Sequence, residues 1–157
     1  MSLLAVIGGA LPAATQASEK ATIPEPFIRP GVATAVAIRL RSGFAIAMRQ
    51  VRDVQQCRAL FEPLASDPER LLVRADYRPA TKELETSYCN RRAVAVTHIG
   101  QPFTWVCRTF SGLTAHQAAI VLIHEALHFG GLPESPRVPD AMTSQEINFL
   151  VIGRCKP

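Results

Sequence analysis

The sequence predicts an α+β fold, in which a small twisted sheet, largely antiparallel, carries three helices packed on one face. Two observations lead to this prediction. Apolar residues recur at spacings of three and four in some segments, which is typical of amphipathic helices, and they alternate with polar residues in others, which is typical of strands. A chain of 157 residues also suits one domain with a single core.

The first residues are apolar and uncharged. An apolar run over residues 3–11 is followed by Pro12 and then by small residues as far as Ala17. This pattern predicts that residues 1–17 are a signal peptide or apolar leader. The run is too short to cross a membrane, since a spanning helix needs roughly 20 apolar residues. We therefore expect an exported protein, periplasmic or extracellular, with no stable membrane insertion after processing.

Residues 18–45 are predicted to be an N-terminal arm whose structure the sequence leaves open. Three prolines interrupt its first part. The apolar stretch that follows is broken by Ser42 and Gly43, so a hairpin and two short helical pieces fit it equally well. The domain itself is expected over residues 46–157.

The domain is predicted to begin with a helix and a strand. From about Ala47 to Pro63, apolar side chains recur every three or four residues, with charged side chains on the other face. Residues 70–78 alternate instead, which predicts a strand with one solvent-exposed face. Residues 93–100 and 103–110 are then predicted to form two antiparallel strands joined by a short turn.

Two capping boxes mark the last two helices. Thr114, with Gln117 three residues later, predicts a helix that starts at Ala115. The pair Gly130–Gly131 is expected to end this helix, because glycine readily adopts the left-handed conformation. A second capping box, formed by Thr143 and Glu146, predicts a final helix.

The four cysteines predict two structural disulfides in an oxidising compartment. They are even in number and widely spaced, with no CxxC pair, so neither a zinc ribbon nor a thioredoxin-type motif is expected. Three pairings are possible. We favour Cys57 with Cys155, because both lie on buried faces of predicted helices, and Cys89 with Cys107, which flank or lie in the strand pair.

The charge distribution argues against a nucleic-acid partner. The formal net charge of +4 arises from 17 basic and 13 acidic residues, and these are scattered along the chain without a basic run. Only one tryptophan is available to stack on bases.

The segment "HEALHFGGLPE", residues 124–134, carries the residue types of a catalytic metal site. His124 and His128 lie one helical turn apart, so both imidazoles can bind one ion, and zinc suits such ligands best. Glu125 lies beside the first ligand, where its carboxylate can act as general base toward water. A third ligand is needed, and the chain can fold back after Gly131 to place Glu134 at the ion.

These residues resemble the zincin metallopeptidases, whose active-site helix carries HExxH. Within that group, His124, Glu125, His128 and Gly131 match the metzincin pattern HExxHxxGxxH. Glu134 stands where that branch has histidine or aspartate. Residues 57–155 also resemble small exported bacterial proteins of metallopeptidase type, which have a HEALH or HELLH core and a terminal helix that ends in cysteine.

The resemblance implies a zincin-like fold and zinc-dependent hydrolysis of a peptide bond, with Glu125 as base. In zincins an edge strand pairs with the extended substrate, and residues 93–110 are the candidate for it. The gluzincin branch takes a glutamate from a following helix, which makes Glu146 an alternative third ligand. Because Glu146 already belongs to a capping box, we favour Glu134.

Two further side chains are candidates for contact with the transition state or substrate. His98 is more simply a hydrogen-bonded structural histidine, and Tyr88 is either a hydrogen-bond donor in the site or half-buried packing.

The expected protein is a monomer that acts on a peptide or protein substrate. Two alternatives stay open: a zinc-stabilised binding or structural domain, in which Glu146 or Asp140 closes the site, and a zinc amidase that acts on cell-wall peptides.

Overall fold

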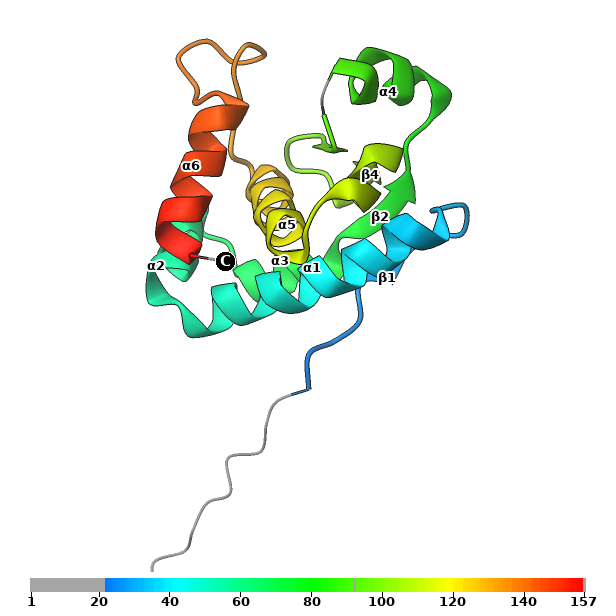
Figure 1. Cartoon of the computed structure of the whole chain (residues 1–157). Coiled ribbons are helices and arrows are strands. Elements are labelled where there is room, and N and C mark those ends of the chain that lie inside the picture. The colour runs from blue at the N-terminus through cyan, green and yellow to red at the C-terminus, as the bar shows by residue number, and fades with distance from the viewer. Residues whose placement is uncertain (1–21, 92, 157) are drawn as a thin grey trace, which may run out of the picture.

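A computed structural model describes residues 22–91 and 93–156 of the chain. The expected signal peptide over residues 1–17 lies outside these described residues, as do residues 18–21 of the expected arm. The described part is an α+β structure in which helices pack around a small four-stranded mixed sheet (Figure 1). Within it, no helix combines the length and the apolar character that a membrane span requires.

The sheet has the strand order β1-β2-β4-β3, where β1 is Phe27–Ile28, β2 is Asp76–Pro79, β3 is Ala95–Thr97 and β4 is Phe103–Val106. The predicted antiparallel pair is present, with Val96 opposite Trp105, although both strands are shorter than expected. The largely antiparallel character is not confirmed, because β2 pairs in parallel with both β1 and β4. Parallel neighbours need long crossover connections, and here the intervening helices supply them.

Helix α1, Thr34–Asp53, occupies the stretch that the sequence left open. Ser42 and Gly43 do not interrupt it. Gly43 faces α5, Ala115–Phe129, and a Cβ added there would lie 2.6 Å from the Cβ of Ala118. The glycine is therefore a close-packing position between two helices rather than a break. After α1, the chain continues in α2, Gln55–Arg58, and a 3-10 helix η1, Ala59–Leu64, where a single helix was expected.

The prediction of a strand over residues 70–78 is wrong for its first half. Residues Pro68–Arg74 form helix α3, and only β2 is extended. The Asp67 side chain accepts hydrogen bonds from the backbone N–H groups of Glu69 and Arg70, and Pro68 occupies the first helical turn. These local start signals outweigh the alternating pattern, because they satisfy otherwise unpaired N–H groups.

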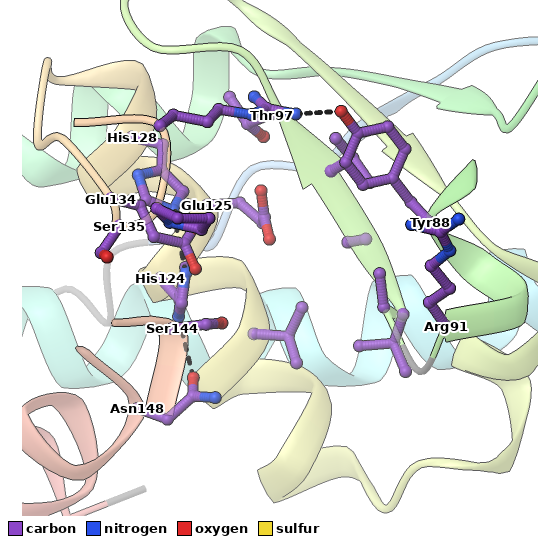
Figure 2. A pocket seen from close by; sticks show the side chains of 17 residues that line it. Tyr88, Arg91, Thr97, His124, Glu125, His128, Glu134, Ser135, Ser144 and Asn148 are labelled. Atoms are coloured by element: carbon purple, nitrogen blue, oxygen red, sulfur yellow. Dashed lines mark hydrogen bonds and ion pairs between the residues drawn. The ribbon is translucent and has the colours of Figure 1, made fainter. Parts of the chain in front are cut away.

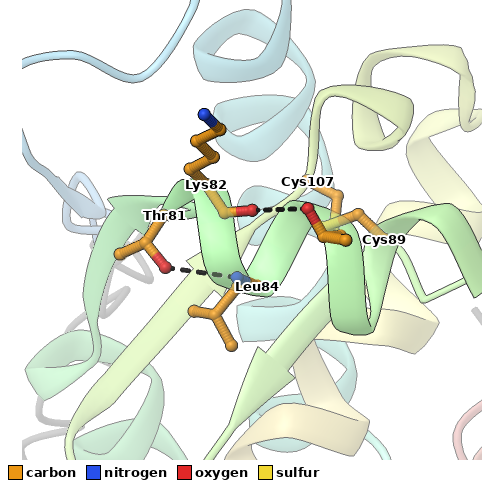
Figure 3. The surroundings of a disulfide bond; sticks show 6 residues. Thr81, Lys82, Leu84, Cys89 and Cys107 are labelled. Carbon is orange, nitrogen blue, oxygen red and sulfur yellow. Dashed lines mark hydrogen bonds between the residues drawn. A yellow bond between two sulfur atoms is a disulfide. The ribbon is translucent and has the colours of Figure 1, made fainter.

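The polar stretch after β2 forms helix α4, Lys82–Ser87, and a 3-10 turn η2, Cys89–Arg91. Thr81 caps α4 by accepting a hydrogen bond from the Leu84 N–H at 3.2 Å (Figure 3). Nearby, the Cys89–Cys107 disulfide ties η2 to the chain after β4, where the 3-10 helix η3, Arg108–Gly112, follows. The Cys57–Cys155 disulfide ties α2 to α6, Ser144–Cys155, so both favoured pairings are present.

Helices α5 and α6 begin at the two predicted capping boxes, with both reciprocal hydrogen bonds formed in each. At the end of α5, Gly131 takes the left-handed conformation with φ of +108°. One face of α5 forms the centre of the hydrophobic core. Its buried apolar members are Ala118, Ala119, Leu122, Ile123, Ala126 and Leu127.

An ion-pair cluster joins the first two strands, and we call it the two-arginine cluster. The buried Asp76 carboxylate accepts hydrogen bonds from Arg29 at 2.9 Å and from Arg78 at 2.6 Å. Burial alone would raise the pKa of Asp76, but the hydrogen bonds from the two arginines outweigh it and hold this pKa below its ordinary value.

Candidate metal centre

Three side chains converge at the C-terminal end of α5. The Nε2 atoms of His124 and His128 lie 2.9 Å apart, and Glu134 Oε2 lies 3.2 Å from His128 Nε2. The chain returns through Gly130 and Gly131 so that Glu134 joins the histidines (Figure 2). The ligand atoms of all three side chains lie within 4.8 Å of one another, as one coordinated ion requires.

The outer nitrogen of each imidazole is hydrogen-bonded to an oxygen. His128 Nδ1 donates to the Leu132 carbonyl at 2.9 Å, and His124 Nδ1 lies 2.8 Å from Asn148 Oδ1 on α6. A carbonyl oxygen only accepts, so these contacts place the protons on Nδ1 and direct both Nε2 lone pairs inward. Metal-binding histidines are oriented by the same kind of outer contact.

The charged groups around His128 and Glu134 favour a bound positive charge. Burial lowers the pKa of His128, but the hydrogen bond to Glu134 and the charge of Glu125 outweigh burial and raise this pKa above its ordinary value. The same hydrogen bond from His128 lowers the pKa of Glu134. A proton on His128 satisfies the carboxylate, and a divalent cation that displaces this proton satisfies it as well.

Glu125 lies next to the three converging side chains and is only 7% exposed. Its Oε2 atom is buried and has no hydrogen-bond partner among the described residues. A buried carboxylate oxygen without a partner costs about 1–3 kcal/mol or more, so such an atom indicates a place for a bound group. The Glu125 charge also adds to the effect of burial in raising the pKa of Tyr77, which lies in β2.

A cleft of about 410 Å³ opens beside these residues. Figure 2 shows His124, Glu125, His128 and Glu134 on one side of it and Tyr88 and Arg91 on the other. Strand β3, which lies at an edge of the sheet, forms part of the wall. The remaining lining comes from the segment of residues 134–137 and from Ser144 and Asn148 on α6.

The structure places the other candidates as follows. Glu146 is exposed, and its carboxylate accepts a hydrogen bond from the Thr143 N–H at 2.7 Å, so it stays in its capping box away from the three converging side chains. Asp140 is exposed and does not line the cleft. His98 also lies outside the cleft, exposed beyond the end of β3, with its ring 4.9 Å from that of Trp105. Tyr88 does line the cleft.

Asn148 and Arg137 were not among the residues expected at the site. Asn148 holds His124, and Arg137 donates a hydrogen bond to the Tyr88 hydroxyl. The sequence gives one indication of Asn148, which is a polar amide directly after Ile147, a member of the apolar stripe of α6. For Arg137 we find no such signal.

Comparisons of this chain with protein-family models, with curated proteins and with solved structures found no match. Its function is therefore inferred from its own residues and their arrangement.

Proposed function

We propose that this chain is a small exported zinc-dependent peptidase of zincin-like type. One observation carries the proposal: the inward-facing nitrogens of His124 and His128 meet the Glu134 carboxylate directly beside the buried, unpaired oxygen of Glu125. The two disulfides support an oxidising and hence extracytoplasmic location.

The donor set favours zinc among the biological metals. Two imidazoles and one carboxylate are a recurrent ligand set of catalytic zinc, whereas calcium and magnesium prefer oxygen donors alone. Structural zinc sites are closed by a fourth protein ligand. Among the described residues, the metal-binding group has three members, which favours a catalytic ion over a structural one. Bound there, zinc would supply a Lewis acid that polarises a peptide carbonyl and makes water more acidic.

Glu125 is suited to move the proton. Its carboxylate lines the cleft and has an oxygen available to accept a hydrogen bond from water. In hydrolysis, the oxygen of water forms a bond with the carbonyl carbon, and Glu125 accepts the proton. When the C–N bond breaks, Glu125 returns this proton to the leaving amine. Tyr88 lines the opposite wall, which supports a contact between its hydroxyl group and the carbonyl oxygen or the substrate backbone.

Strand β3 is suited to hold the substrate. It pairs with β4 on one side only and lies at the end of the strand order, next to the cleft. An extended peptide can pair with such an edge through main-chain hydrogen bonds. This mode of binding fixes the direction of the peptide and brings one of its carbonyl groups to Glu125.

The test is cleavage of an unfolded protein by the oxidised, zinc-loaded chain. We expect wild type to be active, Glu125→Gln to retain zinc but lose at least about a hundredfold in rate, and Glu134→Ala to lose both zinc and activity. Glu146→Gln is the matched control, since glutamine preserves the capping box, and it should behave as wild type. Full activity of Glu125→Gln, or of wild type after removal of metal by a chelator, would overturn the proposal.

A further inference from the structure

The cleft has a cationic end, and its two arginines, Arg91 and Arg137, have no part in the hydrolysis step. Tyr88 and Arg91 lie across the cleft from the histidines (Figure 2). Arg137 reaches the same end, since its guanidinium donates a hydrogen bond to the Tyr88 hydroxyl and lies 5.2 Å from the centre of the Tyr88 ring. The tyrosine therefore fixes a positive charge at this rim.

Among the described residues, no acidic side chain nearby balances the charges of Arg91 and Arg137. Within the part of the chain that the structure describes, neither Arg91 nor Arg137 forms an ion pair with an acidic side chain. Glu125 and Glu134 are the acidic residues that line the cleft, and they lie at its opposite end. Glu134 already forms an ion pair with His128. A divalent ion there would balance these two carboxylates, so the arginines set the net charge that a ligand meets.

We propose that the cleft takes peptides that carry a carboxylate, and that Arg91 and Arg137 bind this group away from the reacting peptide bond. The cleavage of such peptides rests on the proposed function, whereas their binding rests only on the bound ion that balances Glu125 and Glu134. Guanidinium groups bind carboxylates through paired, charge-assisted hydrogen bonds, and a cationic rim also attracts an anionic peptide from solution. The carboxylate is that of an aspartate or glutamate side chain or of the peptide C-terminus.

Tyr88 is a positioning residue in this arrangement. Its ring and hydroxyl hold Arg137, which otherwise belongs to an exposed loop with many side-chain conformations to lose on binding. Tyr88→Phe should therefore weaken the preference for acidic peptides less than Arg137→Gln does, because the ring contact remains.

The test measures peptide binding by fluorescence anisotropy, with the Glu125→Gln variant so that nothing is cleaved. The probes are labelled alanine-serine peptides of equal length that carry two glutamates, two glutamines or two lysines, each with a free or an amidated C-terminus. Each probe is measured with and without added zinc. Arg91→Gln and Arg137→Gln are compared with Arg49→Gln, which removes an exposed arginine of α1 outside the cleft.

We expect a peptide with a carboxylate to bind roughly three- to tenfold more tightly than its neutral counterpart, and lysine peptides to bind most weakly. Arg91→Gln and Arg137→Gln should each reduce this preference, and Arg49→Gln should leave it unchanged. Loss of the preference on amidation identifies the C-terminal carboxylate as the bound group, and its persistence with glutamate peptides identifies the side chain.

Equal affinity for acidic and neutral peptides, or a preference that survives loss of both arginines, would overturn the inference. Failure of the proposed function is distinguishable: the preference would then be present while wild type, loaded with zinc, cleaves none of the peptides.

Discussion

The contact between α1 and α5 gives a stability prediction that also concerns the metal centre, because α5 carries both histidines of the centre and Glu125 beside them. At Gly43, an added Cβ would lie 2.6 Å from the Cβ of Ala118 and within 3.1 Å of two backbone atoms of α5. Real Cβ contacts of this length do not occur, so one helix must move. Forced overpacking of this kind costs about 1–3 kcal/mol.

Gly43→Ala should therefore destabilise the protein although alanine is the better helix former. Replacing glycine by alanine inside a helix contributes about 1 kcal/mol of stability. Subtracted from an overpacking cost near the upper end of that range, this leaves a net loss of about 1–2 kcal/mol in the free energy of unfolding. For a domain of this size, about 1 kcal/mol corresponds to roughly 3 °C in Tm.

Gly153 in α6 is the matched control. It also lies in a helix, but a Cβ added there meets no atom within 4 Å. Gly153→Ala should therefore raise the free energy of unfolding by about 0.5–1 kcal/mol. The assay is urea unfolding of the oxidised proteins, followed by circular dichroism. If Gly43→Ala stabilises the protein as much as Gly153→Ala does, the close approach of α1 to α5 is not as the structure has it.

Three further predictions concern single features. Asn148→Leu removes the hydrogen bond that orients His124, so zinc affinity should fall roughly 10- to 100-fold in competition with a chelating dye, and an unchanged affinity would contradict this role. The Cys57–Cys155 disulfide joins residues 98 apart in the sequence, and the Cys89–Cys107 disulfide joins residues 18 apart. Because a longer closed loop restricts the unfolded chain more, replacing both cysteines of a pair by alanine should cost about 4.7 kcal/mol for Cys57–Cys155 and about 3 kcal/mol for Cys89–Cys107 in urea unfolding. The reverse order would contradict this reasoning. The pKa of Asp76 is lowered in the folded state, so its contribution to stability is present above the unfolded pKa of about 3.9 and is lost as the pH falls through the lower folded value. Asp76→Asn should thus be less stable than wild type at pH 7 by about 1.5–3 kcal/mol in the free energy of unfolding. When the pH is lowered below about 4, the free energy of unfolding of the variant should fall by less than that of wild type. An equal fall for the two proteins would refute this.

The parts of the site that were predicted from the sequence depend on local geometry. A spacing of four on a helix places His124 and His128 on one face wherever the helix lies, and the capping box and the glycines define its two ends. Glu134 follows within one short turn, so its approach also depends on a few neighbouring residues. The pairing of Cys57 with Cys155 follows from the buried faces of the helices that carry them, and that of Cys89 with Cys107 from their position at the strand pair.

The parts that were missed depend on contacts between distant segments. Gly43 was interpreted as a possible break, because the reason for a glycine there is Ala118 on another helix. The parallel pairing of β1 with β2 could not be predicted, since it is set by how the intervening helices pack. Asn148 reaches His124 because α6 packs against α5, and Arg137 reaches Tyr88 because residues 134–137 line the same cleft.

The error over residues 70–74 has a different cause. The alternating apolar residues predict a strand, but Asp67 and Pro68 together mark the start of a helix. A seven-residue helix is too short for its apolar periodicity to be recognised, so the cap is the stronger signal.

The measurement that tests the central claim most directly is the zinc K-edge X-ray absorption spectrum of the purified, oxidised wild-type protein, together with its zinc content. We predict one zinc ion per chain, bound only by nitrogen and oxygen at about 2.0–2.2 Å, with the scattering pattern of two imidazoles. Absence of stoichiometric zinc, or a sulfur ligand at about 2.3 Å, would contradict a centre built from His124, His128 and Glu134.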